Sequence, residues 1–338
     1  MSGSIFATGK LPLDLLARLL SRMSNDDERL LVGPGIGEDA AVIDMGHHYL
    51  VAKTDPITFA TDQIGWYAVN VNANDVACMG ATPRWFLVTV LFPEGKTDEL
   101  LVEEIFDQLG RACNQLDITI AGGHSEVTYD LDRPIVVGHL LGEVAKEKLV
   151  TSAGAQVGDD ILLTKGIPIE GTSLIAREKE EDLLGKGYEP EFIAQAKRLL
   201  HHPGISVIRE ALLANSLVKV HAMHDPTEGG LATGLWELAV ASEVGILVDE
   251  AAVPIIPAGA RLCQEYGLDP LGTIASGSLL LVISPGDTKA LLTKLSEEGI
   301  TCSTIGQVVE KGQGLKMKKG GQAVPLPRFT VDEITKIF

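Results

Sequence analysis

Residues 67–83 read YAVNVNANDVACMGATP, and this stretch organises the first half of the chain. From about Asp62 to Met79, small and apolar residues predict one long helix. Four polar side chains fall within six positions of it: Asn70, Asn72, Asn74 and Asp75. Such residues compete with a helix for backbone hydrogen bonds, and buried polar groups need partners. We therefore expect a buried helix whose polar patch meets a ligand or a second chain; a solvated face is the alternative.

The segments on both sides of this helix alternate between strand and helix patterns. Residues 40–44 and 49–54 read as strands joined by a turn around Gly46. After the helix, TPRWFLVTVLFPEG predicts a strand, and Thr97 is expected to cap the next helix, with acidic residues beside the positive end of its dipole. The remaining predicted segments of this half are a helix at 11–23 and strands at 117–121 and 134–144.

The small and polar stretch KEKLVTSAGAQVGDD (146–160) is typical of a hinge between two halves. Beyond it, a second alternation of strands and helices begins. Its predicted helices are 171–181, 190–201, 204–214, 229–243, 257–266 and 286–298, and its predicted strands are 160–164, 219–223, 245–249, 278–284 and 303–309. The sequence therefore predicts an α/β (α+β) protein with two domains, 1–153 and 154–338.

Composition excludes several classes of protein. The 338 residues carry 28 Lys and Arg against 46 Asp and Glu, a net charge of −18, which argues against nucleic-acid binding. No apolar run approaches the ~18 residues of a membrane span, and the N-terminus lacks a secretory signal pattern. The scattered cysteines form no metal or disulfide pattern and suit a reducing compartment. They are Cys78, Cys113, Cys263 and Cys302. We expect a cytoplasmic protein without membrane contact.

Carboxylates recur beside glycines or at strand ends. Asp39 follows the Gly-rich VGPGIGE, Asp55 ends a strand before proline, and Asp225 precedes Gly-Gly at a helix start. Each has a plainer alternative: a solvated tight turn, a turn residue, or a helix cap. Together with Asp75 they could hold a nucleotide triphosphate only through bridging Mg²⁺, because bare carboxylates repel phosphate.

Two glycine-rich segments could approach a ligand closely. Gly122 and Gly123 follow a strand in AGGHSEV and precede His124 in an expected turn. GIPIEGTS (166–173) has phosphate-loop spacing between Gly166 and Gly171 but lacks the lysine, so it is predicted only as a Gly-rich ligand loop. No catalytic triad can be defended. His124 and His224 are the candidate general bases.

The motifs occur in the order seen in the aminoimidazole ribonucleotide synthetase (PurM-like) superfamily, which this chain resembles from about residue 10 to 310. The motifs are GIGEDAAVID, TDPIT, NVNANDVACMGATPRW, AGGHSEV, GIPIEGTSLIARE and HDPTEGGLATGLWELA. The resemblance implies an N-terminal β-rich domain that binds ATP with Mg²⁺ and forms a homodimer, followed by a C-terminal α/β domain. It also implies transfer of the γ-phosphate to a nucleophile on a small substrate.

The resemblance also implies roles for individual residues. Asp39, Asp55 and Asp75 match the metal-binding acids of the family's G-[DE]-D-A, T-D and [NS]-D motifs. Asp225 matches the acid of its D-x-T-x-G segment, which reaches metal in the selenophosphate branch. The remaining matches are expected to bind the nucleotide: Gly122, Gly123, His124, Gly166 and Gly171.

The branch of the family is left open. DPTEGGLA is most similar to the motif of the hydrogenase-maturation protein HypE, but Glu228 stands where arginine is usual, and the chain ends DEITKIF without HypE's C-terminal cysteine. The leading hypothesis is an ATP- and Mg²⁺-dependent HypE-like enzyme that activates a small substrate by phosphoryl transfer. The alternatives are a small-molecule kinase similar to thiamine-monophosphate kinase and a non-catalytic nucleotide-binding subunit that serves a maturation partner.

Overall fold

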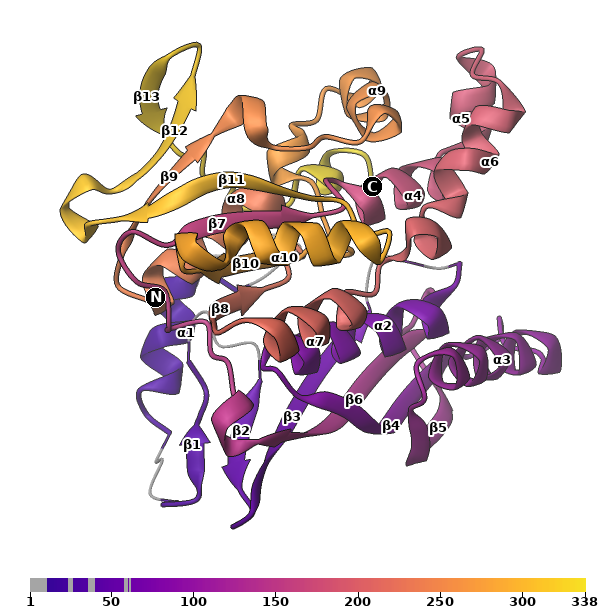
Figure 1. Cartoon of the computed structure of the whole chain (residues 1–338). Coiled ribbons are helices and arrows are strands. Elements are labelled where there is room, and N and C mark those ends of the chain that lie inside the picture. The colour runs from indigo at the N-terminus through magenta and orange to yellow at the C-terminus, as the bar shows by residue number, and fades with distance from the viewer. Residues whose placement is uncertain (1–10, 24–26, 36–39, 58–59, 61) are drawn as a thin grey trace, which may run out of the picture. The chain divides into compact units, whose positions relative to one another are not determined.

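The computed structural model describes residues 11–23, 27–35, 40–57, 60 and 62–338. It is a mixed α/β protein with two sheets, as the sequence predicts (Figure 1). Of the described residues, those in Asp27–Gly33 and Asp39–Leu149 form one compact unit. Those in Met1–Asp26, Pro34–Glu38 and Val150–Phe338 form the other. The domain boundary at 153/154 stays a prediction.

The first unit is built on a six-stranded sheet in the order β1-β2-β3-β6-β4-β5. All neighbours are antiparallel except β4 and β5, which run parallel. Strands β1 and β5 are the two edges of the sheet, and nine of the ten residues of β5 are exposed. The strands are β1 (Leu30–Val32), β2 (Ala41–Asp44), β3 (His48–Ile57), β4 (Thr82–Pro93), β5 (Thr119–Thr128) and β6 (Ile135–Ala145).

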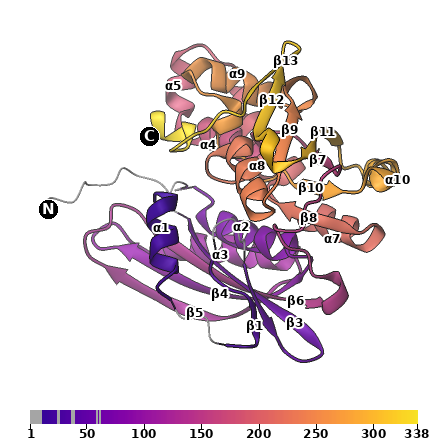
Figure 2. The ribbon, with the colours of Figure 1, turned by 90° about the vertical axis from the view of Figure 1, so that its left-hand side faces the viewer.

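Helices α2 (Ile64–Cys78) and α3 (Glu99–Gln115) cover one face of this sheet (Figure 2). All fifteen residues of α2 are buried, as the small, apolar sequence predicts. Close packing of α2 on β6 needs glycine at two points, because a Cβ at Gly138 or Gly142 would collide with a side chain of α2. The residues of β6 alternate between buried and half-buried, which is the pattern of a sheet covered more fully on one face.

The cap of α3 differs from the prediction by one residue. Asp98, not Thr97, is the N-cap, and its carboxylate accepts a hydrogen bond from the Leu101 amide at 2.9 Å. The Thr97 hydroxyl instead donates to the Pro93 carbonyl at 2.7 Å. Both residue types favour the position, and the backbone path out of β4 decides between them.

The second unit is built on a seven-stranded sheet in the order β13-β12-β9-β11-β7-β10-β8. The five predicted strands are present. The hairpin β12/β13 is absent from the sequence-based prediction, because its two strands are only five and four residues long. The strands are β7 (Asp160–Thr164), β8 (Val220–His224), β9 (Gly245–Asp249), β10 (Leu280–Ile283), β11 (Cys302–Val309), β12 (Leu315–Lys319) and β13 (Gln322–Pro325).

Helices cover both faces of the second sheet. Helix α8 (Gly230–Ala241) packs on one face, where Leu231 and Leu235 join a core with Ile161 and Leu163 of β7. Helices α7 and α10 lie on the opposite face (Figures 1 and 2). The further helices of this unit are α1 (Leu13–Leu20), α4 (Ile169–Glu178), α5 (Glu180–Gly185), α6 (Pro190–Arg198), α7 (Ile208–Leu217), α9 (Pro257–Tyr266) and α10 (Pro285–Glu297).

Short helical turns complete the chain. A π-type turn at Leu200–Gly204 contains Pro203, so the helix predicted at 204–214 begins only at Ile208. Across the described residues, no helix is long and apolar enough to cross a membrane. The 3-10 turns are Lys146–Lys148, Glu250–Ala252, Pro270–Gly272, Lys311–Gln313 and Glu333–Lys336.

Candidate functional site

Two of the four predicted metal-binding carboxylates converge in the first unit. Asp55 lies on β3, and Asp75 lies on α2, which packs against that strand. The Oδ2 atom of each lies against the ammonium of Lys53, at 3.3 Å for Asp55 and 3.2 Å for Asp75. Lys53 and Asp55 share a face of β3 because they are two residues apart. The two carboxylates therefore meet around one cationic centre.

An asparagine of α2 fixes the backbone of Asp55. The Asn72 amide oxygen accepts from the Asp55 N–H at 2.8 Å, and its Nδ2 donates to the Asp55 carbonyl at 3.2 Å and to the Ala68 carbonyl at 2.8 Å. Asn70 donates to the Trp66 carbonyl of its own helix at 2.9 Å. Asn72 therefore finds its partners within the unit and positions Asp55. The ligand or second chain expected for this polar patch stays a prediction.

The other two predicted carboxylates lie outside the described part of the first unit. Asp39 lies outside the described residues. Asp225 is buried in the second unit, in the loop between β8 and α8. It is not the cap of α8, because the N-cap residue is Gly229 and its amide donates to Asp332 at 2.6 Å. Within the described parts of the chain, no three His, Cys, Asp or Glu side chains are grouped so that they could hold a metal ion.

The segment with Gly122, Gly123 and His124 is a strand, and the predicted turn is wrong. These residues lie inside β5, where Gly123 pairs with Val88 of β4. A Cβ at Gly123 would collide with the Val88 carbonyl, so glycine is needed for strand pairing. The exposed His124 lies 3.0 Å from Glu126 through Nε2 and Oε2. The sequence indicates a turn because it contains Gly-Gly. Pairing with the distant strand β4 overrides this local preference.

The segment GIPIEGTS is a buried strand-to-helix connection instead of an open loop. Every residue from 166 to 176 is buried, and α4 begins at Ile169. Gly166 has a φ of +107°, and a Cβ there would press on the Pro254 carbonyl. Gly171 packs against the loop before β10, where its amide donates to the Ile274 carbonyl at 3.0 Å. Packing accounts for both glycines.

An acidic pair that sequence reasoning missed lies where the C-terminal segment meets α4 and α8. Burial raises the pKa of Glu170 to about 7, and burial raises the pKa of Asp332 to about 6. The Asp332 carboxylate accepts hydrogen bonds from the Gly229, Ile274 and Ile334 amides at 2.6, 3.2 and 2.8 Å. No local pattern signals this arrangement, because its partners are distant in sequence.

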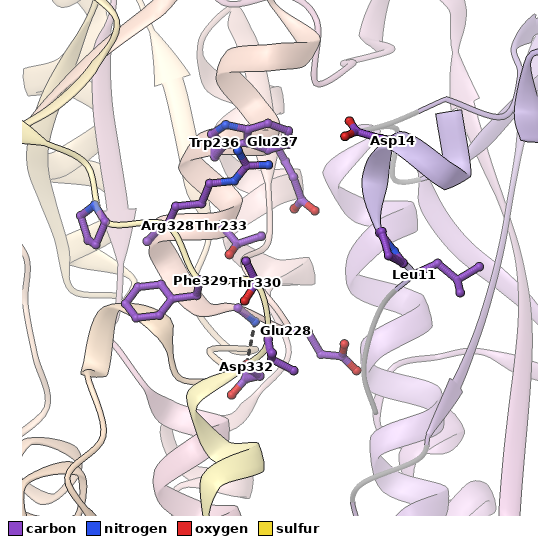
Figure 3. A pocket seen from close by; sticks show the side chains of 15 residues that line it. Leu11, Asp14, Glu228, Thr233, Trp236, Glu237, Arg328, Phe329, Thr330 and Asp332 are labelled. Atoms are coloured by element: carbon purple, nitrogen blue, oxygen red, sulfur yellow. Dashed lines mark hydrogen bonds between the residues drawn. The ribbon is translucent and has the colours of Figure 1, made fainter. Parts of the chain in front are cut away.

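A cavity of about 380 Å³ opens beside this junction (Figure 3). Its walls come from α8, from the start of α1 and from the segment 327–332. The Arg328 guanidinium lies 5.0 Å from the centre of the Trp236 ring, a cation–π distance. The buried candidate base His224 lies 3.1 Å from the Glu237 carboxylate, and Glu237 lines the cavity. His224 therefore contacts the cavity only through Glu237.

Two family models match the chain. Residues 37–144 match "AIR synthase related protein, N-terminal domain", and residues 156–318 match "AIR synthase related protein, C-terminal domain". A putative hydrogenase expression/formation protein of Methanocaldococcus jannaschii is 29% identical over 313 residues, which cover 88% of each chain. The carbamoyl dehydratase HypE of Cupriavidus necator is 29% identical, covering 80% of this chain and 75% of that one. The selenide, water dikinase of Nitratidesulfovibrio vulgaris is 28% identical, covering 87% and 90%.

Solved structures show the same fold. HypE in complex with ATP has a TM-score of 0.71 and 24% identity, covering 93% of this chain and 91% of that one. A chain in the structure of a HypE–HypF complex has a TM-score of 0.71 and 20% identity, covering 93% of this chain and 99% of that one. AaThiL complexed with AMPPCP and TMP has a TM-score of 0.70 and 23% identity, covering 93% and 94%.

Proposed function

The chain belongs to the AIR synthase related protein family, and on that basis we propose that it is an ATP- and Mg²⁺-dependent enzyme. It activates a small substrate by transfer of a phosphoryl group. Similar proteins bind ATP or an ATP analogue in their solved structures, and one relative is a selenide, water dikinase. These names support nucleotide use by this chain and leave its acceptor open.

The observation that carries the proposal is the convergence of Asp55 and Asp75 on one cationic centre. Both carboxylates reach the Lys53 ammonium within 3.3 Å, so a single cation position lies within reach of both Oδ2 atoms. Carboxylate oxygens are the ligands that Mg²⁺ prefers, and the buried Asn72 holds Asp55 in place. The donor set therefore fits a hard cation. Asp55 and Asp75 would hold the Mg²⁺ ion, which would supply positive charge to offset that of the nucleotide phosphates.

Other residues keep the roles that the family resemblance implies. Asp39 and Asp225 are proposed to complete the cation ligands, and Gly122, Gly123 and His124 to contact the nucleotide. For Gly166 and Gly171, the buried packing limits the proposed role to shaping the start of α4. His224, paired with Glu237 beside the cavity, is favoured over the exposed His124 as the candidate general base.

Product analysis tests the proposed reaction. The purified protein is incubated with ATP, with and without Mg²⁺, and each mixture is assayed for ADP, AMP and phosphate. Phosphoryl transfer predicts Mg²⁺-dependent ADP formation that increases when the correct acceptor is added. Release of AMP would favour chemistry of a different type, and complete absence of turnover with all acceptors would overturn the enzymatic proposal.

A second candidate is a non-catalytic nucleotide-binding subunit of a maturation system. The last cysteine is Cys302, which lies in β11, and burial raises its pKa to about 12. A thiol with so high a pKa is a poor nucleophile at neutral pH, so Cys302 is not suited to accept a group from a substrate. One solved relative forms a HypE–HypF complex, which supports a protein partner for this candidate. Tight ATP binding without turnover is the result that would favour it.

A homodimer is proposed through the sheet of the first unit. Strand β5 leaves an unpaired edge, and it carries the exposed apolar side chains of Ile120 and Val127. Long exposed edges of this kind tend to pair with another chain. The dimer is also what the family resemblance implies for the N-terminal β-rich part.

A further inference from the structure

We propose that Lys53 is a built-in counter-cation, which occupies the position between Asp55 and Asp75 and must leave before a divalent cation can bind both carboxylates. The inference deepens the proposed function and rests on it for the identity of the competing ion, a divalent cation. Lys53 then sets how tightly the protein binds that ion when no nucleotide is present.

The geometry places ammonium and metal in direct competition. The Lys53 Nζ lies 3.3 Å from one Asp55 oxygen and 3.2 Å from one Asp75 oxygen. Mg²⁺ binds carboxylate oxygens at about 2.0–2.1 Å. An ion that reached both oxygens would occupy the space that the ammonium now fills, so both cannot be bound at once.

Because the Lys53–Asp75 pair is buried, displacing the ammonium lowers the affinity of the site for a divalent cation. The side chains of Lys53 and Asp75 are only 17% and 6% exposed, while that of Asp55 is 36% exposed. A buried carboxylate whose counter-charge is removed is strongly destabilised, so Asp75 keeps a cation near it in either state. The ammonium is therefore held until another positive charge replaces it, and part of the binding energy of the metal is used to displace it.

Once displaced, the Lys53 ammonium can contact the nucleotide, which would link metal binding to nucleotide binding. Its four-carbon stem is flexible and its ammonium is a mobile point charge, which can pair with a phosphate oxygen after it leaves the carboxylates. The nucleotide would then supply a new partner for Lys53 while the metal takes over the old ones. We infer that metal and nucleotide bind cooperatively in the natural protein, and that metal alone binds weakly.

The test measures Mn²⁺ binding to the full chain without nucleotide, by calorimetry or by electron paramagnetic resonance of the free ion. Lys53→Met removes the ammonium and keeps most of the stem. It is expected to bind Mn²⁺ about tenfold or more tightly than the natural protein, because no charge has to be displaced. Lys146→Met is the matched control. Lys146 also pairs with an aspartate of this unit, Asp44, at 2.7 Å, and its loss should leave Mn²⁺ affinity unchanged.

A second measurement uses the natural protein and does not depend on the variant folding. Acylation of lysines, read by mass spectrometry, should label Lys53 several-fold faster in saturating Mn²⁺ than in EDTA, while Lys146 labels at the same rate in both. Unchanged Mn²⁺ affinity in a folded Lys53→Met protein, or unchanged labelling of Lys53, would overturn the inference. ATP binding by the natural protein is measured separately: its absence would overturn the proposed function, whereas the Mn²⁺ data decide the role of Lys53.

Discussion

The Asp332 carboxylate accepts a hydrogen bond from the Gly229 amide at 2.6 Å, across 103 positions of sequence. Gly229 is the N-cap of α8 and has a φ of +82°. Because glycine has no side chain, the N-cap residue itself cannot provide a capping hydrogen bond. A carboxylate at this end of a helix satisfies an orphan amide and faces the positive end of the dipole. The C-terminal segment thus supplies the cap that α8 lacks locally, and it forms one wall of the cavity beside that helix.

Replacement of this cap should lower the stability of the second unit. Asp332→Ala leaves three backbone amides without their acceptor, including that of Ile274. We expect the free energy of unfolding to fall by about 2 kcal/mol at neutral pH, measured by urea denaturation. Asp249→Ala removes a cap from a short exposed turn and should cost clearly less. Equal losses in the two variants would show that Asp332 does not hold α8.

The buried carboxyl of Glu170 should make stability fall as pH rises. Burial raises its pKa from 4.5 to about 7, so between these values the folded protein keeps a proton that the unfolded chain releases. Its stabilising effect is complete below about pH 4.5 and is lost as pH rises through about 7. The free energy of unfolding of Glu170→Gln, relative to that of the natural protein, should therefore rise by about 2–3 kcal/mol from pH 5 to pH 8.

Denaturant titrations at the two pH values measure this difference for Glu170. Glu103→Gln, at an exposed position of α3, serves as the control and should follow the natural protein at both pH values. Asp332 contributes in the same direction, because burial raises its pKa to about 6. A constant difference between Glu170→Gln and the natural protein from pH 5 to pH 8 would contradict the assignment.

Removal of one carboxylate of the candidate cation site should abolish Mg²⁺-dependent turnover. Asp75→Asn keeps the size of the side chain and removes its charge, so we expect nucleotide turnover to fall about a hundredfold or more. Circular dichroism should show an unchanged fold. Asp44→Asn breaks another aspartate–lysine pair of the same unit and should retain activity. Normal turnover by Asp75→Asn would exclude Asp75 as a metal ligand.

A charge on the exposed edge strand should separate the proposed dimer. The Val127 side chain on β5 is 57% exposed, and Val127→Glu places a carboxylate where two edges would meet. Light scattering after size exclusion should show a dimer for the natural protein and a monomer for this variant. Leu100→Glu changes a 73% exposed residue of α3 and should leave the dimer intact. A monomeric natural protein would remove this interface from the account.

The sequence predicts most of the fold because its signals are local. The apolar run of α2 and the strands on either side of Gly46 need no distant partner to be recognised. The GGHSE segment fails for the opposite reason, since its strand exists through parallel pairing with β4. The hairpin β12/β13 is missed because its strands are short. Tertiary pairing determines both segments, and local propensity does not report it.

The candidate site is predictable only in part, for the same reason. The positions of Asp55 and Asp75 follow from strand-end and helix patterns, and the alternation of β3 could also have placed Lys53 on the same face as Asp55. The buried pair Glu170 and Asp332 could not be predicted, because the segments that bury it come together only in the folded unit. Asp39 lies outside the described residues, so its assignment stays a prediction.

The most direct test of the central claim is a calorimetric titration of ATP into the purified protein, with and without Mg²⁺. An ATP- and Mg²⁺-dependent enzyme should bind ATP with a saturable heat signal in Mg²⁺ and much more weakly in EDTA. The Asp75→Asn variant should lose this difference. Absence of ATP binding in Mg²⁺, by a protein shown to be folded, would contradict the claim and with it the assignment of Asp55 and Asp75.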